Sequence, residues 1–568
     1  MNLLHSEMLG SFSRRSFVLR ASSLLATPAL FHMGRSAWAD TVETGKTAVV
    51  QTMYGQLRGI GENGVFIFKG IPYTGPSDGE NRFQPPTKLQ PWTGVRDALE
   101  YGPQATQQKS PGSAGVASSE NCQFINIWTP SVDKGGKKPV MYYLHGAGFI
   151  GGSGGSGKNL LHDGSALSRD NDVVVVTSNH RLGAMGYLYL GDLSKKYPAS
   201  GIAGMLDIVA SLQWIHDNIA SFGGDPDNVF IFGESGGGQK VCALLGMPSA
   251  HGLFHKGSVE SAPSMYMNNR EIATKTTLEV MKQLGLSANQ VDELVNVPPD
   301  RLMEAQAVVR ARSVDMEGTL GYFGPVVDGN YLPRHPYDPT GPAISKNVAL
   351  IIGSNKQEGL LRLQEEPETF KIDEAGLKAH IRTRLGDEKV ASDMYQLYRK
   401  NRPDAGPFEV YVDFLTHQWM WVDTTRRCER QLALHGAPVY TYIFDYESEV
   451  PISASISYPR KAIHGSEVAF KFDHPENDPT TGSRPERLQA AKNMSRAWAA
   501  FARSGDPSHS GIPKWPAYTL DQRATMVLNS TCTVVNDPMR DERLAWVKIP
   551  DKIGAKPHLQ GVAGGESS

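Results

Sequence analysis

The sequence is poor in cysteine and lacks a long apolar run beyond its first 39 residues. Its 568 residues include only four cysteines, at Cys122, Cys242, Cys428 and Cys532. So few cysteines at such wide spacing exclude a disulfide framework and a C-x-x-C metal site, and buried free thiols are expected. Because no later apolar run approaches bilayer length, we predict no membrane span.

The sequence also lacks an excess of charge of either sign. It contains 57 Lys and Arg against 59 Asp and Glu, a formal net charge of −2. This slightly acidic balance gives no electrostatic reason to bind nucleic acid. With 40% hydrophobic and 20% charged residues, the composition is that of a globular protein.

Residues 1–39 are predicted to be an export signal rather than part of the fold. A twin-arginine motif that contains Arg14-Arg15 is followed by a short apolar segment at 21–30, and Ala37-Trp38-Ala39 supplies the small residues of a cleavage site. An uncleaved amphipathic helix would leave both features unexplained. The mature chain would begin near Asp40 and be periplasmic or secreted. Cleavage removes four arginines and one glutamate, which leaves a formal net charge of −5.

The centre of the chain alternates short apolar segments with a helical pattern. Residues 139–145, 172–180 and 228–232 are rich in β-branched and aromatic residues and too short for core helices, so they are predicted to be buried strands. Between the last two, apolar residues from Met205 to Ile219 recur at spacings of three and four, which is typical of an amphipathic helix. This order predicts an α/β fold with a mostly parallel sheet and helices on both faces.

Two further central strands are predicted at 347–354 and 438–446. The segments at 270–320 and 360–435 are polar and helix-patterned, and no linker rich in Pro, Gly or Ser isolates them. We therefore expect helical insertions that cover a site rather than independent domains.

Residues 40–550 are accordingly predicted to form a single domain. Its last long helix is expected at 485–503, where a Ser-Gly-Asp-Pro sequence ends the helical pattern. The tail at 551–568 is predicted to be disordered.

Two glycine-rich segments place a serine in a G-x-S-x-G pattern, and their surroundings distinguish them. Ser235 follows the apolar segment 228–232 and precedes a helical pattern, which is the strand–turn–helix context of a nucleophile. Ser153 is flanked by further glycines and precedes an irregular segment. Ser235 is therefore the predicted nucleophile, and the pattern at Ser153 is attributed to chance.

The segment Gly152–Lys158 also begins like a phosphate-binding loop. Asn159 occupies the position where a Ser or Thr would hold Mg²⁺, and no clean helix begins there, so we reject a nucleotide site. The strand before this loop ends earlier, at His145. The small residues that follow, Gly146–Gly148, would let backbone amides stabilise negative charge on a carbonyl oxygen.

A serine nucleophile needs a base to take its proton and a carboxylate to orient that base. In α/β-hydrolases the acid follows the nucleophile along the chain and the histidine comes last. Glu358 follows the predicted strand at 347–354, and His464 lies on a loop after the one at 438–446. Neither residue is convincing alone, but their order and placement together make them the candidates.

Further short segments match the motifs of one family. They extend over roughly residues 47 to 540, and through them the chain resembles the type B carboxylesterases, a branch of the α/β-hydrolase fold. The segments are FKGIPY (68–73), RFQPP (82–86), ENCQFINIWTP (120–130), HGAGF (145–149), HRLGAMGYL (180–188), NIASFGGDPDNVFIFGESGGG (218–238), GPVVDGNYLP (324–333), GSNKQEG (353–359) and HGSE (464–467).

The resemblance implies a carboxylic ester hydrolase that acts on a small-molecule ester through an acyl-enzyme, without metal or cofactor. An amidase or carbamate hydrolase with the same triad stays open, and a non-catalytic binding protein is the third alternative, although such relatives typically lose triad residues. The oligomeric state is not predicted. The implied site comprises the triad Ser235, Glu358 and His464, the oxyanion-hole donors Ala147, Gly148 and Gly236, and the substrate-binding residues Phe149 and Glu234, of which Glu234 has a structural hydrogen-bonding role as its alternative.

The chain departs from the family pattern in several places. Ala147 replaces the usual middle glycine of the oxyanion loop, so bulky esters are expected to fit less well. Cys122 has no earlier cysteine in the mature chain with which to form the family's loop disulfide. The segment 102–119 has no aromatic residue to hold a quaternary ammonium, which disfavours choline esters. The aromatic run 417–421 could line a pocket, but its spacing favours core packing.

Overall fold

The computed structural model describes residues 42–549, apart from 109–114, 157–159, 312–320 and 365. The predicted export signal at 1–39 and the predicted tail at 551–568 lie outside the described residues. So do Lys158 and Asn159 of the glycine-rich loop.

Within the described residues, one 13-stranded sheet forms the centre of the fold, and its middle is parallel. Each neighbouring pair in this middle part is parallel, including the pairs on both sides of the strand that leads to Ser235. All five predicted strands are present. In spatial order the parallel strands are β9 (Val174–Ser178), β8 (Lys138–Leu144), β10 (Gly224–Glu234), β11 (Lys256–Glu260), β14 (Ala349–Asn355), β15 (Val439–Phe444) and β18 (Ala524–Leu528).

The two ends of the sheet are antiparallel except for the parallel pair of β2 and β4, and the sequence did not indicate these outer strands. Strands β1 and β2 alternate buried and exposed residues, because only one of their faces is covered, and they therefore lack the apolar runs that reveal the central strands. The flanking strands are β7 (Phe124–Thr129), β3 (Val65–Pro72), β2 (Gln56–Glu62), β1 (Thr47–Gln51) and β4 (Val95–Asp97) at one end and β19 (Thr533–Asn536) at the other.

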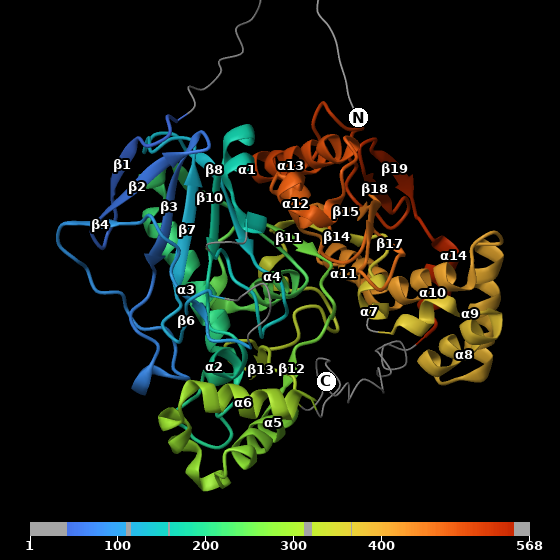
Figure 1. Cartoon of the computed structure of the whole chain (residues 1–568), viewed down its shortest axis with the longest axis horizontal. Coiled ribbons are helices and arrows are strands. Elements are labelled where there is room, and N and C mark those ends of the chain that lie inside the picture. Colours follow the sequence, from blue (N-terminus) through green and yellow to red (C-terminus); the bar gives the residue numbers. More distant parts are fainter. Residues whose placement is uncertain (1–41, 109–114, 157–159, 312–320, 365, 550–568) are drawn as a thin grey trace, which may run out of the picture. The chain divides into compact units, whose positions relative to one another are not determined.

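Helices cover both faces of the sheet, as predicted (Figure 1). Successive side chains of a strand point to opposite faces, so Tyr142 belongs to one core cluster and Tyr143 to the other. Helices α3 (Ala203–Asn218) and α4 (Gly236–Gly246) pack in the first cluster. The second contains α1 (Ser165–Asn171), α12 (Val468–Lys471) and α13 (Glu486–Ser504).

Two helical insertions extend from the sheet, at the bottom and the right of Figure 1. Residues of each insertion contribute to an apolar cluster. Tyr322, which follows the first insertion, and Leu361 and Trp419, which belong to the second, reach the site described below. The first insertion contains α5 (Arg270–Gln283) and α6 (Pro299–Ala311); the second contains α7 (Leu360–Leu363), α8 (Glu374–Leu385), α9 (Glu388–Asn401), α10 (Pro407–Thr416), the π-helical turn η10 (His417–Trp421) and α11 (Val422–Leu432).

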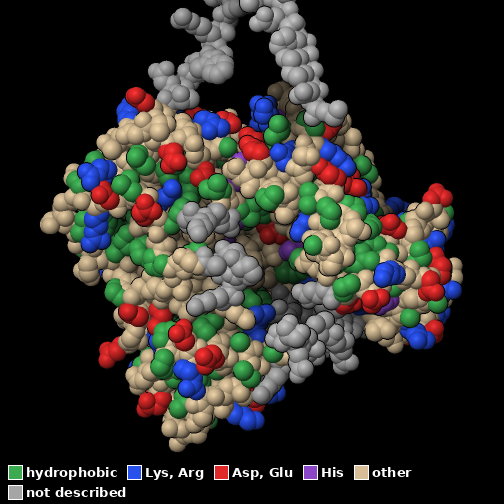
Figure 2. Space-filling model, viewed as in Figure 1, with side chains coloured by type: hydrophobic (Ala, Val, Ile, Leu, Met, Phe, Trp, Pro, Cys, Tyr) green, Lys and Arg blue, Asp and Glu red, His purple; other side chains and the backbone are tan. Residues whose placement is uncertain are grey.

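The four cysteines are all buried and unpaired, which confirms the expected free thiols. Within the described ranges, no helix combines the length and the apolar character needed to cross a bilayer. On the face drawn in Figure 2, Lys and Arg side chains are interspersed with Asp and Glu, as expected from the nearly neutral composition.

Candidate active site

Ser235 lies in the tight turn that joins β10 to α4, the strand–turn–helix arrangement that the sequence predicted. Its φ of 60° and ψ of −120° are strained for a residue with a side chain. The strand and helix approach closely because Gly233 and Gly237 flank the turn. A Cβ on these glycines would lie 2.7 Å and 2.0 Å from the carbonyl oxygen of Leu144. The turn therefore requires glycine at both positions.

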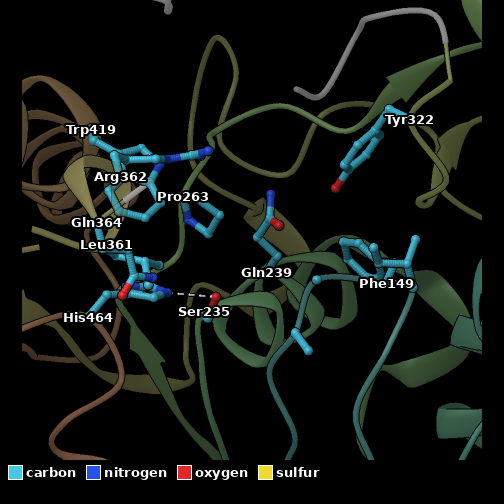
Figure 3. Close-up of a pocket in the computed structure, with 13 residues that line it drawn as sticks. Phe149, Ser235, Gln239, Pro263, Tyr322, Leu361, Arg362, Gln364, Trp419 and His464 are labelled. Atoms are coloured by element: carbon cyan, nitrogen blue, oxygen red, sulfur yellow. Dashed lines mark hydrogen bonds between the residues drawn. The ribbon is translucent and has the colours of Figure 1, made fainter. Parts of the chain in front are cut away.

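Three side chains that are distant in sequence form one hydrogen-bonded chain, of which Figure 3 shows the contact between His464 and Ser235. Nε2 of His464 lies 2.8 Å from Oγ of Ser235, and Nδ1 lies 2.5 Å from Oε2 of Glu358. The other carboxylate oxygen of the fully buried Glu358 accepts hydrogen bonds from the amide of Asn355 at 2.7 Å and the hydroxyl of Ser261 at 2.5 Å. The structure thus brings together the three residues that the sequence selected.

Glu234, immediately before Ser235, faces the same histidine. Its Oε1 lies 3.2 Å from Nε2 of His464. Burial alone would lower the pKa of His464, but the negative charges of Glu234 and Glu358 outweigh it and raise the pKa. For Glu234 burial acts in the opposite direction, because it disfavours the negative carboxylate, and the pKa of Glu234 is raised. The described residues that line the cavity do not include Glu234, so its position is that of an electrostatic neighbour of the histidine.

The loop after β8, residues 145–149, forms the other side of this centre, and we call it the oxyanion loop. Ala147 and Gly148 both have a φ of 61°, and among the described residues no carbonyl accepts a hydrogen bond from their amides. Gly236, the first residue of α4, packs directly on Gly148, since a Cβ there would lie 2.5 Å from the nitrogen of Gly148. Three backbone amides therefore lie in adjoining segments next to Ser235.

A cavity of about 290 Å³ opens onto Ser235 and His464. Figure 3 shows Phe149 and Tyr322 on one side and Trp419 on the other, with Gln239 between them. Phe149, which the family resemblance implied as a substrate-binding residue, is part of the cavity lining. The cavity is lined by Ala147, Gly148, Phe149, Ile150, Ser235, Gln239, Pro263, Tyr322, Leu361, Arg362, Gln364, Trp419 and His464.

The aromatic run 417–421 divides between the core, which its spacing favoured, and the cavity, which was the other possibility. All five side chains are buried, and His417 bonds to the hydroxyl of Tyr398 at 2.6 Å. The ring of Trp419, however, lies 5.0 Å from that of His464 and lines the cavity. These residues form a π-helical turn, a winding that is frequent at functional sites.

Several residues of the site had no signal in the sequence. Ser261 follows β11 and reaches Glu358 only because β11 and β14 are neighbours in the sheet. Gln239 and Tyr322 line the cavity from α4 and from the end of the first insertion. Their roles depend on tertiary contacts rather than on a motif.

The glycine-rich loop around Ser153 has a structural arrangement of its own. The amide of Gly152 donates to Oε1 of Gln107 at 2.9 Å, and that of Gly154 donates to Oδ1 of Asn179 at 2.8 Å. These amides are satisfied by side chains of the protein, unlike the free amides of a phosphate-binding loop. In the described parts of the chain, no group of three or more His, Cys, Asp and Glu side chains could hold a metal ion.

The parallel sheet, the strained serine between strand and helix, and the histidine and acid on later loops define an α/β-hydrolase. The family model of the carboxylesterases matches residues 46–547. The chain therefore belongs to the carboxylesterase family, and it is a serine carboxylesterase.

Individual relatives agree with this assignment. The para-nitrobenzyl esterase of Bacillus subtilis is 34% identical over 502 residues, which cover 87% of this chain and 97% of that protein. The phenmedipham hydrolase of Pseudarthrobacter oxydans is 31% identical, over 84% of this chain and 94% of that protein. Among solved structures, a carboxylesterase of Geobacillus stearothermophilus has a TM-score of 0.75 and 36% identity, with 88% of this chain and 99% of that chain covered.

Proposed function

We propose that the protein hydrolyses small carboxylic esters through nucleophilic attack by Ser235 and an acyl-enzyme intermediate. The proposal rests on two consecutive hydrogen bonds, one between Ser235 and His464 and one between His464 and Glu358. Nε2 of His464 takes the hydroxyl proton as Oγ attacks the ester carbonyl, and the same nitrogen returns it to the leaving alkoxide. Water, activated by His464, then attacks the acyl-enzyme, releases the acid and restores Ser235.

Glu358 keeps the imidazole in the orientation that this transfer needs. Its Oε2 accepts from Nδ1 of His464, which fixes the free lone pair on Nε2 toward Ser235. Two donors on Oε1, from Asn355 and Ser261, prevent the carboxylate from rotating. The carboxylate also stabilises the imidazolium that forms when the histidine is protonated.

The amides of Ala147, Gly148 and Gly236 are proposed to receive the oxyanion. Charge grows on the carbonyl oxygen as the tetrahedral intermediate forms, and donors already in place stabilise it without reorganisation. Two features support this assignment. The first two amides have no carbonyl acceptor within the described chain, and the third lies at the N-terminus of α4, where helical amides are unsatisfied.

The size and lining of the cavity favour esters of modest size that carry an apolar or aromatic group. Its volume is about 290 Å³, and Phe149, Tyr322 and Trp419 present aromatic surface beside the reacting atoms. The name of the Bacillus relative makes para-nitrobenzyl esters reasonable first substrates.

The test is to label the mature protein with a fluorophosphonate and to map the adduct by mass spectrometry. An adduct on Ser235 and loss of turnover in Ser235→Ala are expected, whereas Ser153→Ala should retain turnover. An adduct on Ser153 would overturn the assignment. Para-nitrophenyl esters of increasing acyl length, assayed beside matched anilides, separate an esterase from an amidase.

A further inference from the structure

Lys240 occupies an unusual position beneath the oxyanion loop. It lies on α4 five residues after Ser235, and its side chain is fully buried. Nζ donates a hydrogen bond to the carbonyl oxygen of His145 at 2.8 Å and another to that of Gly148 at 2.9 Å. One ammonium group therefore holds the loop on both sides of its two proposed donor amides.

The ring of Phe149 occupies a third side of the same ammonium group. Nζ lies 5.4 Å from the centre of that ring, within the range of a cation–π contact. An ammonium has three N–H donors, and two carbonyls and an aromatic face are enough to receive them. All three contacts come from the oxyanion loop, so Lys240 is attached to this loop rather than to an acidic partner.

Packing alone does not explain a lysine at this position. Its neighbours on α4, Val241 and Leu244, are apolar core residues, and an apolar side chain would fill the same space. Burial lowers the pKa of Lys240 to about 7, against a smaller opposite effect from Glu234. The other ionisable groups nearby, His145 and His180, have pKa values lowered by burial and further by Lys240 itself. The protein thus keeps an ionisable group here despite the cost of burying it, and its amino group contacts the oxyanion loop.

The loop needs such a restraint because its backbone is not at an intrinsic minimum. Ala147 has a φ of 61°, in the left-handed region that residues with a Cβ avoid. Gly148 has the same φ and would be flexible without external contacts. The hydrogen bonds that Lys240 donates to the carbonyls of His145 and Gly148 fix the two ends of the segment that contains Ala147.

We propose that Lys240 is a positioning residue of the oxyanion hole. It holds the loop so that the amides of Ala147 and Gly148 face the substrate carbonyl next to Ser235. The inference rests on the proposed function and goes beyond it by assigning a task to a side chain outside the triad.

Lys240→Met tests the inference in the mature protein, since methionine keeps the length of the side chain and removes the donors and the charge. For para-nitrophenyl butyrate, we expect kcat to fall about 100-fold, the typical effect of losing an oxyanion donor, with KM changed less than about threefold. The Ki of a trifluoromethyl ketone, whose adduct is itself an oxyanion, should rise by a similar factor. The Ki of the matching methyl ketone should stay within about twofold. For Lys240→Gln, which keeps one donor group, kcat and the Ki of the trifluoromethyl ketone should lie between those of the wild type and Lys240→Met.

Cys242→Ala is the matched control, because Cys242 is a buried residue of the same helix and lies outside the site. It should leave kcat within about threefold. The proposal is wrong if Lys240→Met keeps its kcat and its affinity for the trifluoromethyl ketone. It is also wrong if both ketones weaken equally, or if Cys242→Ala loses as much activity.

Folding and the basal reaction are checked separately. Circular dichroism and thermal unfolding report whether each variant folds. If Lys240→Met does not fold, Lys240→Gln tests the proposal by the same kinetic criteria. If neither variant folds, Lys240 serves the fold and the proposal is wrong. A wild-type protein without ester turnover would overturn the proposed function itself, whereas the ratio of variant to wild type tests only Lys240.

Discussion

Oε1 of Glu234 lies 3.2 Å from Nε2 of His464, the same ring nitrogen that contacts Oγ of Ser235 at 2.8 Å. This carboxylate oxygen is buried and has no hydrogen-bond partner among the described residues, so the contact with His464 is electrostatic. The histidine is thus placed between two carboxylates, with Glu358 on Nδ1 and Glu234 beside Nε2. Both favour the imidazolium, and its pKa is raised.

Glu234→Gln should therefore move the acidic limb of the pH profile of kcat/KM to lower pH. The negative charge of Glu234 favours the protonated histidine, so its removal lowers the pKa of His464 and makes the free base available at lower pH. We expect a shift of about one pH unit, equivalent to about 1.4 kcal/mol. The measurement is kcat/KM for para-nitrophenyl butyrate between pH 5 and 10.

A matched surface variant is Glu271→Gln, on the exposed side of α5, which should leave the limb in place. If the limb stayed unchanged or moved to higher pH in Glu234→Gln, the electrostatic role of Glu234 would be refuted.

Ser261→Ala should lower kcat by about tenfold. The mutation removes the donor 2.5 Å from Oε1 of Glu358 and leaves only the amide of Asn355 to hold that oxygen. A hydrogen bond to a buried carboxylate is worth about 1.5 kcal/mol or more, which corresponds to this factor. Ser258→Ala is the control, because Ser258 donates to another buried carboxylate, that of Glu260, from the same strand. Equal losses in both variants would mean that the effect is not specific to Glu358.

The positions of Ser235 and Ser261 show which part of the site the sequence can predict. Ser235 was identifiable because the strand and the helix that determine its geometry are its immediate neighbours in sequence. Ser261 and Lys240 were not, because Ser261 meets Glu358 across 97 residues and Lys240 meets His145 across 95. Contacts of this kind follow from the order of strands in the sheet, which local patterns do not contain.

The same distinction holds for the fold. Central strands such as β9, buried on both faces, are apolar throughout and were predicted from that property. Strand β1 alternates buried and exposed residues over only five positions, a pattern too short to separate from a loop. For the run that contains Trp419 the spacing favoured the core over the cavity but could not separate them, because which side chain of the π-helical turn faces the site depends on tertiary packing.

Trp419→Ala should impair aromatic esters more than small aliphatic ones. The indole lines the cavity 5.0 Å from the ring of His464, with the guanidinium of Arg362 4.3 Å from its own ring. Aromatic contacts contribute about 0.5–1.5 kcal/mol beyond area burial, so kcat/KM for a para-nitrobenzyl ester should fall up to about tenfold more than that for a methyl ester. Trp421→Phe, in the buried part of the same turn, should affect both esters equally. Equal losses in Trp419→Ala would argue against a role in substrate selection.

Export by the twin-arginine route is a proposal that rests on residues 1–39 alone. Replacement of Arg14-Arg15 by Lys-Lys should hold the precursor in the cytoplasm, because the route depends on the arginine pair. Cell fractionation with esterase assays measures the distribution, and N-terminal sequencing of the exported protein should begin near Asp40. Unchanged export of the double variant would contradict the proposal.

Ala147→Gly should widen the range of esters that the site accepts. Ala147 lines the cavity beside Ser235, so we expect loss of its methyl group to give room for a branched acyl or alcohol group. We expect kcat/KM for a pivaloyl ester, relative to the acetyl ester, to rise at least about fivefold. An alanine at a φ of 61° costs about 1 kcal/mol, which glycine avoids, but glycine also gives the unfolded chain more freedom, so Tm should change by only a few degrees. An unchanged ratio of the two esters would mean that this methyl group does not limit the substrate and that the opposite wall, formed by Trp419 and Leu361, does.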